Sequence, residues 1–204
     1  MTQEPPSSSP AAVPSNKTSP WHLLGLTLLV LLAFVSGFLT AAAVQSDKFQ
    51  VQRSTLIAAS PEQVFPHVND LHQWDAWSPW AKKDPNAVNS FEGPDAGVGA
   101  KFKWSGNSEV GEGQMTITGS TPGELVQIKL EFTKPFEDAS DVEFVFRPEG
   151  DQTRVIWTMS GVQANFIGKV MCLLMNMDKM VGGDFEKGLA SMKSVVESAN
   201  TAAQ

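Results

Sequence analysis

Two side chains of this sequence are candidates for acid–base chemistry, a guanidinium at Arg53 and a carboxylate at Glu112. Arg53 has the same strand parity as Val51 and Ile57, so in an extended segment it would share the face of these apolar residues. Glu112 lies between two glycines, which could bulge a strand and turn its carboxylate inward. An enzyme that moves protons needs such a group beside its substrate. A catalytic pair made of these two residues is therefore one hypothesis.

Arg53 has two other interpretations. The first, which we favour, is a position at the edge or end of a sheet, where a long cationic side chain reaches water. The second is an anchor for the acidic group of a ligand.

We expect neither a metal nor a cofactor. His67 and His72 lie near Asp70 and Asp75, but a spacing of five residues puts the two imidazoles on different faces of a helix, with no third clear ligand. The single cysteine, Cys172, excludes an internal disulfide and a thiolate metal cage. The sequence contains no glycine-rich phosphate loop and no nucleophile elbow.

The charge of the chain argues against nucleic acid as a partner. The 204 residues carry a net charge of −7, and Lys82–Lys83 is the only adjacent basic pair. Phosphate binding requires clustered lysine and arginine, so we expect no nucleic acid to bind. A hydrophobic content of 42% is enough for a sizeable core.

The first 45 residues differ in composition from the rest. Residues 1–20 are rich in proline and serine and predict disorder. Leu23 to Val44 carries no charge and has about the ~20 residues that a membrane-spanning helix needs, with Trp21 suited to the interface. We expect four segments: a tail (1–20), a transmembrane anchor (21–45), a folded domain (46–199) and a short tail (200–204). The chain would be a single-pass membrane protein, and the flanking charges do not decide on which side the domain lies.

A cleavable signal peptide is the alternative to this anchor. Ala41 to Ala43 supplies small residues of the kind found at cleavage sites. The region before the apolar run is long, proline-rich and barely basic, and the run exceeds the usual ~7–15 residues of a signal core. We therefore favour an uncleaved anchor.

The remainder predicts two short helices between a first strand and a run of further strands. Ser60 to Gln63 has the features of a helix start, with a proline at the first helical position. A second short helix is expected over Asp70–Trp77. Alternating apolar and polar residues, separated by Gly-, Pro- or Asn-containing turns, then predict antiparallel strands. With the strand before the helices, the predicted strands are Phe49–Ala58, Val88–Glu92, Ala100–Ser105, Gly113–Ser120, Leu125–Phe132, Asp141–Arg147 and Thr153–Ser160.

A long C-terminal helix is predicted from about Asn165 to Ala199. Its apolar residues recur every three or four positions, and its other face is charged. The predicted strands have one apolar face on which this stripe would pack. The expected fold class is α+β, with a seven-stranded curved antiparallel sheet wrapped around the C-terminal helix.

Three tryptophans, Trp74, Trp77 and Trp80, fall within seven residues. Indole rings need large apolar surroundings and usually a partner for the N–H group. The cluster is either a rigid plug at one end of the core or an aromatic rim over a pocket, and both interpretations stay open.

This order of elements resembles the helix-grip fold of the SRPBCC (START-like) superfamily. Residues 60–65 look like the start of that family's first helix. Further stretches are similar to its polyketide cyclase/dehydrase-like branch: 74–85, 111–117, and 177–181 with 184–189. N-terminal membrane anchors also occur in this branch. The resemblance covers Phe49 to Glu197.

The resemblance implies a cavity between sheet and helix that binds an apolar small molecule or a lipid. With the two tryptophans of the possible rim, the expected lining is Trp77, Trp80, Phe102, Trp104, Met115, Ile117, Ile128, Leu130, Phe144, Trp157, Met159, Val181, Phe185 and Leu189. Gly182 and Gly183 inside the helix predict a bend or a close approach. A filled core is the alternative for every lining residue.

Three functions therefore remain open. The one we favour is a membrane-anchored domain that binds an apolar small molecule or lipid. The others are a cyclase- or dehydratase-like enzyme using Glu112 or Arg53, and a protein-interaction module.

Overall fold

The computed structural model describes residues 20–44, 48–162 and 177–202, and the structural statements below concern these residues. The chain divides into two compact units after Val44, and each unit is described by itself. The part of the predicted C-terminal helix before Met177 and most of the predicted N-terminal tail lie outside the described residues.

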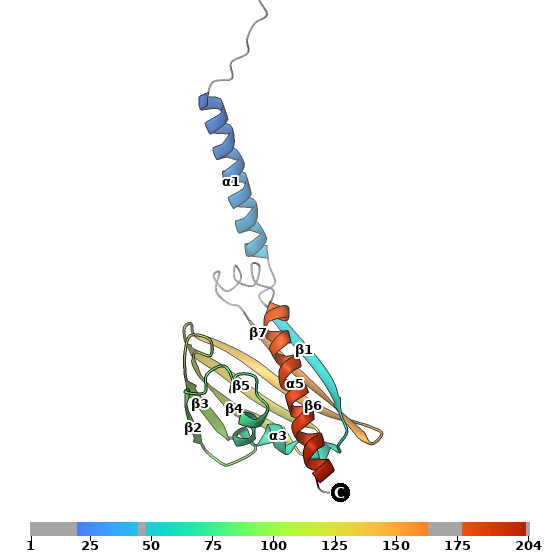
Figure 1. Ribbon diagram of the computed structural model, residues 1–204. Coiled ribbons are helices and arrows are strands. Elements are labelled where there is room, and N and C mark those ends of the chain that lie inside the picture. Colours follow the sequence, from blue (N-terminus) through green and yellow to red (C-terminus); the bar gives the residue numbers. More distant parts are fainter. Residues whose placement is uncertain (1–19, 45–47, 163–176, 203–204) are drawn as a thin grey trace, which may run out of the picture. The chain divides into compact units, whose positions relative to one another are not determined.

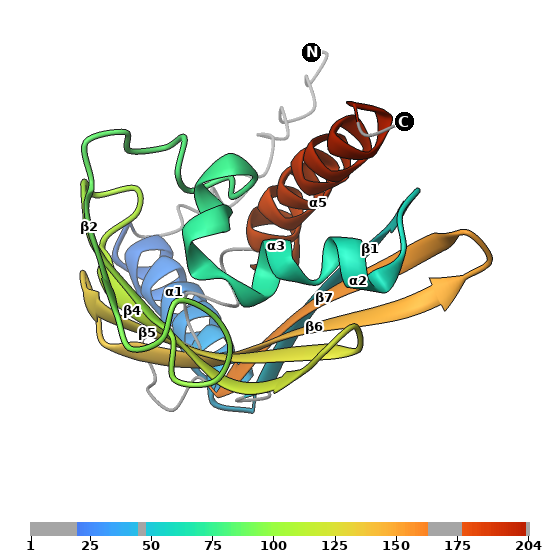
Figure 2. The same ribbon diagram turned by 90° about the horizontal axis from the view of Figure 1, so that it is seen from below.

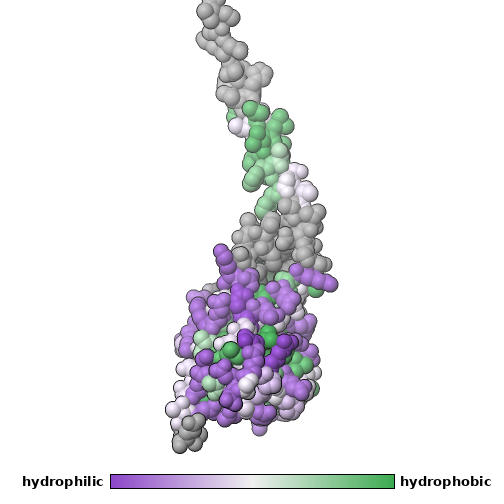
Figure 3. Space-filling model, turned by 90° about the vertical axis from the view of Figure 1, so that its right-hand side faces the viewer, coloured by the Kyte–Doolittle hydropathy of each residue, from purple (hydrophilic) through white to green (hydrophobic). Residues whose placement is uncertain are grey.

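The first unit contains one helix, α1, from Pro20 to Val44. It has 25 residues, none of them acidic or basic apart from a single histidine. Most of its large apolar side chains are exposed, and the helix is coloured mainly as hydrophobic in Figure 3. Over the residues whose side chains the structure describes, no helix reaches the length and hydropathy required to cross a membrane.

The second unit is built on a seven-stranded antiparallel sheet with the order β1-β7-β6-β5-β4-β3-β2. Figure 2 shows that the sheet is curved, with the helices of this unit on its concave side. Short connections make β2 to β7 a meander, and β1 joins it beside β7. The strands are β1 (Lys48–Ile57), β2 (Val88–Glu92), β3 (Lys101–Ser105), β4 (Glu112–Thr121), β5 (Leu125–Lys134), β6 (Asp138–Glu149) and β7 (Gln152–Val162). The predicted seven-stranded helix-grip fold is confirmed.

Three short helices follow β1: α2 (Pro61–Val64), α3 (Pro66–Asn69) and the 3-10 helix η1 (Leu71–Ala76). The Ser60 N–H donates to Gln63 Oε1 at 3.0 Å, as expected at a capped helix start. Pro66 divides the first predicted helix because proline cannot continue the hydrogen-bond ladder. The second predicted helix has 3-10 rather than α geometry, and Asp70 caps it by accepting the His72 N–H at 2.9 Å.

The closing helix, α5, runs from Met177 to Ala202 (Figure 1). Its stripe residues Phe185, Leu189, Met192 and Val196 are all buried against the rest of the unit. The central contact is a parallel stack of the Phe185 ring on the Trp157 ring of β7, with centroids 3.9 Å apart and an interplanar angle of 8°. The predicted use of this stripe as a core-facing surface is therefore confirmed.

Polar side chains of α5 cover the outer edge of the sheet at the end of β1. Lys193 Nζ donates to the Leu56 carbonyl at 2.8 Å, and Glu197 Oε1 accepts the Ala58 N–H at 2.8 Å. Asn200 Nδ2 donates to the Ala58 carbonyl at 3.3 Å. These groups satisfy backbone positions that an uncovered edge strand would expose.

Candidate functional site

The two ends of the sheet differ in how completely their apolar side chains are buried. Strand pairing brings Lys48 beside Val162, Ser105 beside Glu112, and Glu112 beside Lys134. These residues mark one end of the sheet, which we call the Lys48 end. The opposite end, where β1 finishes and the short helices begin, we call the packed end.

The packed end is filled by interlocked aromatic side chains. Trp157 stacks on Phe185 and on Phe144, whose centroid is 4.8 Å away, and Trp77 meets it edge-on at 5.6 Å. A β-carbon at Gly188 would lie 3.0 Å from the Trp157 ring, so α5 approaches the sheet closely here. In this part of the interior the filled-core alternative applies.

The tryptophan cluster forms part of this packing. The indole N–H of Trp74 donates to the Val68 carbonyl at 3.0 Å, and that of Trp77 donates to the His67 carbonyl at 2.8 Å. Both rings are buried, whereas Trp80 is half-buried and packs edge-on against Phe185. The plug interpretation therefore describes Trp74 and Trp77.

Toward the Lys48 end, apolar side chains on the concave face are only partly buried. Five such residues pack against the core and are partly buried: Phe49, Phe102, Trp104, Leu130 and Val181. Trp104 lies over Gly113, where any β-carbon would overlap its ring, and the Trp104 N–H donates to the Val110 carbonyl at 3.0 Å. We call this group the open apolar surface.

All the predicted lining residues belong to the core cluster or pack directly against it. The structure divides them between the packed end and the open apolar surface. Strand alternation identified the face correctly, but it does not report how deeply each side chain is covered. Whether these residues contact a ligand stays a prediction.

Three buried polar atoms have no hydrogen-bond partner among the described residues: His67 Nδ1, Trp157 Nε1 and Ser140 Oγ. The side chains of Trp157 and Ser140 are buried in the core. Ser140 pairs with Gly161 of β7 and with Leu130 of β5, and it lies near the Lys48 end. The sequence analysis missed it, although its parity with Val142 and Phe144 was a signal that its hydroxyl faces the interior.

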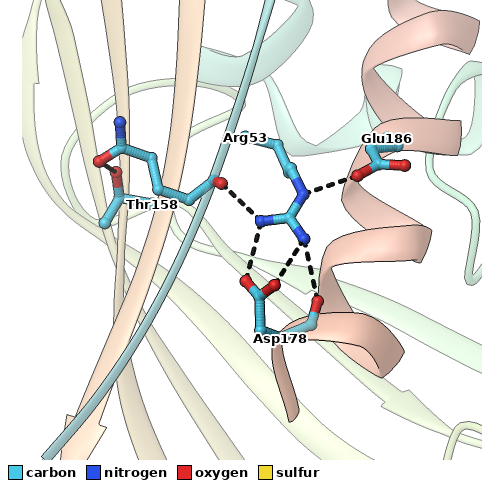
Figure 4. A network of polar contacts seen from close by, with 5 residues as sticks. Arg53, Thr158, Asp178 and Glu186 are labelled. Carbon is cyan, nitrogen blue, oxygen red and sulfur yellow. Dashed lines mark hydrogen bonds and ion pairs between the residues drawn. The ribbon is translucent and has the colours of Figure 1, made fainter. Parts of the chain in front are cut away.

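Arg53 binds the first turns of α5 to β1 (Figure 4). Its Nε donates to Glu186 Oε1 at 2.7 Å. Its Nη1 and Nη2 donate to the two carboxylate oxygens of Asp178 at 2.9 and 3.0 Å. Nη1 also donates to the Gln52 carbonyl at 2.8 Å, and Nη2 to the Asp178 carbonyl at 3.1 Å. All five N–H groups of the guanidinium are thus used within the protein.

This arrangement decides between the interpretations of Arg53. The side chain is 23% exposed and lies on the edge strand β1, as we favoured, but its guanidinium is bound by protein oxygens rather than by water. It pairs with Asp178 and Glu186, two carboxylates that belong to the predicted charged face of α5. With every donor occupied, the guanidinium in this conformation has none left for a ligand's acidic group.

The ion pair alters the pKa values of its members. Hydrogen bonds from the Arg53 guanidinium lower the pKa of the Asp178 carboxyl. Hydrogen bonds to Asp178 and Glu186 in turn raise the pKa of Arg53 well above its ordinary value. Both groups are therefore charged at neutral pH, which favours the attachment of α5 to β1.

The structure does not bring Glu112 and Arg53 together. The predicted bulge exists, since the register of β4 against β5 shifts between Glu112 and Gly113. The Glu112 carboxylate nevertheless binds Lys134 Nζ at 2.9 Å and Ser105 Oγ at 3.0 Å. These hydrogen bonds, that of Lys134 above all, lower the pKa of Glu112. Strands β5, β6 and β7 separate β4 from β1, so the predicted catalytic pair is not assembled.

The two histidines have separate roles. His72 Nδ1 is 2.9 Å from Asp70 Oδ1, and its ring stacks on Phe91 with centroids 3.9 Å apart. These rings border a small cavity of about 200 Å³ between η1 and the β2–β3 connection. His67 is half-buried, and burial lowers its pKa. Within the described ranges no group of three or more His, Cys, Asp or Glu side chains could hold a metal ion.

The chain resembles known proteins over most of its length. A model of the family described as polyketide cyclase / dehydrase and lipid transport matches residues 48–197. A solved structure of a protein from Nitrosospira multiformis is 17% identical and matches 75% of this chain and 99% of that chain, with a TM-score of 0.55. No curated protein sequence matches.

Two other solved structures are similar to this chain over most of its length. Protein CV1439 from Chromobacterium violaceum is 15% identical, with 74% of this chain and 97% of that chain covered and a TM-score of 0.52. Protein TTHA0849 from Thermus thermophilus is 18% identical, with 74% and 99% covered and a TM-score of 0.52. At these identities the likeness shows the fold.

The contact between Gly182 and Arg53 leads to a prediction with a built-in control. A β-carbon at Gly182 would overlap the guanidinium, whereas one at Gly183 would meet nothing within 4 Å. Gly183→Ala should raise the free energy of unfolding by about 0.5–1 kcal/mol through helix propensity. Gly182→Ala should instead lower the free energy of unfolding, because the displaced guanidinium loses its charged hydrogen bonds. Urea denaturation followed by tryptophan fluorescence measures both values.

An Arg53→Ala background completes this test. Without the guanidinium, Gly182→Ala should become as stabilising as Gly183→Ala. If Gly182→Ala were equally stabilising in the presence of Arg53, the close approach would not exist.

The pKa of Asp178 predicts an acid-sensitive attachment of α5. A carboxyl whose pKa is lowered by folding stabilises the folded state above its unfolded pKa of about 3.9. This contribution is lost as the pH falls through the lower folded value. The free energy of unfolding should therefore fall more steeply below about pH 4 in the wild type than in Asp178→Asn or Arg53→Ala. Identical slopes in the three proteins would contradict the ion pair's role.

Proposed function

Because the chain belongs to the polyketide cyclase / dehydrase and lipid transport family, we propose that its folded unit binds an apolar small molecule or a lipid. The observation that carries this proposal is the open apolar surface at the Lys48 end. Its aromatic and aliphatic side chains are continuous with the core but incompletely covered. A ligand seated on them would remove apolar area from water at about 25 cal/mol per Å².

The chemistry of this surface favours an uncharged ligand portion. Phe102, Trp104 and Leu130 offer no charge, and Met115, which pairs with Phe102 and Leu130, is adaptable in shape. Arg53 was the candidate to bind a carboxylate of the ligand, but all its hydrogen-bond donors are already bound within the protein. We propose binding rather than catalysis, because Glu112 pairs with Lys134 and three strands separate its strand from that of Arg53.

We further propose that α1 anchors the protein in a membrane as a single-pass helix. The support is its 25-residue length, its lack of acidic residues, lysine and arginine, and its exposed leucines and valines. Exposed apolar surface of this extent marks a membrane or a protein partner. The side of the membrane on which the folded unit lies is left open.

Ligand binding is tested with N-phenyl-1-naphthylamine, an uncharged probe that fluoresces in apolar sites, added to residues 45–204. Leu130→Gln should weaken probe binding about tenfold, since the loss of roughly 1.4 kcal/mol of apolar contact corresponds to that factor. Leu125→Gln is the matched control: it lies on the same strand and is equally half-buried, but it has the opposite parity. Equal loss in both variants, or no binding by the wild type, would refute the proposed surface.

Membrane anchoring is tested by alkaline extraction of membranes that contain the full chain. The wild-type chain should stay with the membranes. A Leu31→Arg, Phe34→Arg variant should be released, because each arginine at a helix centre costs about 2.5–3.5 kcal/mol on insertion. Release of the wild type to the same extent would exclude the anchor.

A further inference from the structure

Several of the exposed large apolar side chains of the folded unit occur at the Lys48 end. Phe136 is 76% exposed, Val88 is 73% exposed and Val162 is 51% exposed. By contrast Val98, which is 59% exposed, lies between β2 and β3 at the other end of those strands. Exposed apolar residues are ordinary when scattered, so their shared location is the informative feature.

Strand register establishes that location. Val88 pairs with Ser105, and Val162 pairs with Lys48, so both are terminal residues at this end. Phe136 lies in the turn between β5, which ends at Lys134, and β6, which starts at Asp138. Its ring therefore projects from the tip of a hairpin at the same end.

The charges at this end are mixed. Lys134 pairs with Glu112, and Lys48 lies at the same end. Glu109, Glu137 and Asp138 add negative charge beside the hairpin. Because neither sign of charge is clustered here, a partner of this end would be bound mainly through apolar contact.

The connection between α1 and β1 is short. Helix α1 ends at Val44 and β1 begins at Lys48, so three residues connect them. A connection of that length spans at most about 14 Å when fully extended. A bilayer that held α1 would therefore be within reach of the Lys48 end.

We propose that the Lys48 end docks on the surface of a lipid bilayer through Phe136 and Val162. This inference rests on the anchoring and ligand binding proposed above, and it assigns a route for the ligand. The open apolar surface lies toward the same end of the sheet. An apolar molecule thus passes between the bilayer and this surface without crossing a long path through water.

The experiment places single reporters on the full chain in phosphatidylcholine vesicles. In a Cys172→Ser background, Phe136→Cys, Val162→Cys and Val98→Cys are each labelled with bimane. A phospholipid with a doxyl group high on its acyl chain quenches labels that reach the interface. Quenching at positions 136 and 162 should exceed that at the matched control position 98 at least threefold.

The outcomes distinguish this inference from the proposals of membrane anchoring and ligand binding on which it rests. Equal quenching at 136 and 98 in chains that float with the vesicles overturns the docking and leaves the anchor intact. Chains that do not float overturn both the anchor and the docking. Binding of N-phenyl-1-naphthylamine by residues 45–204 is measured separately and decides the ligand proposal by itself.

Discussion

The stack of Phe185 on Trp157 is the contact on which the arrangement of this domain depends. It is a nearly parallel contact with centroids 3.9 Å apart, enclosed by further aromatic rings. Such rings bury large apolar areas and prefer defined geometries, so they fix position as well as supplying stability. With Phe185 stacked on Trp157, α5 crosses the β1 side of the sheet, as Figure 2 shows. The concave face is then divided into a filled part and a part that α5 does not complete.

Partly different interactions hold the two ends of α5. Its C-terminal half is fixed by buried apolar residues such as Leu189, Met192 and Val196, and by hydrogen bonds of its polar side chains to the end of β1. Its first turns are held by Asp178 and Glu186, which bind Arg53, with Gly182 making room for the guanidinium. Apolar packing is insensitive to pH, whereas the ion pair requires an ionised carboxylate. The part of the helix nearest the open apolar surface is therefore also the part held by the Arg53 ion pair.

Much of this fold could be predicted from the sequence because strand alternation and helical periodicity are local signals. The bounds of β2 were predicted without error, and those of β5 and β7 to within two residues. The ligands of Arg53 could not be predicted, since Asp178 and Glu186 lie more than a hundred residues away and look like ordinary surface carboxylates. Parity likewise identified the concave face but not the difference in burial along it. Ser140 was missed because β6 starts three residues before the predicted strand.

The cover that α5 places over β1 has a consequence for self-association. Lys193, Glu197 and Asn200 occupy backbone groups at the end of that edge, while β2 forms the other edge of the sheet. Another copy is therefore hindered from adding a strand at the end of β1 that α5 covers.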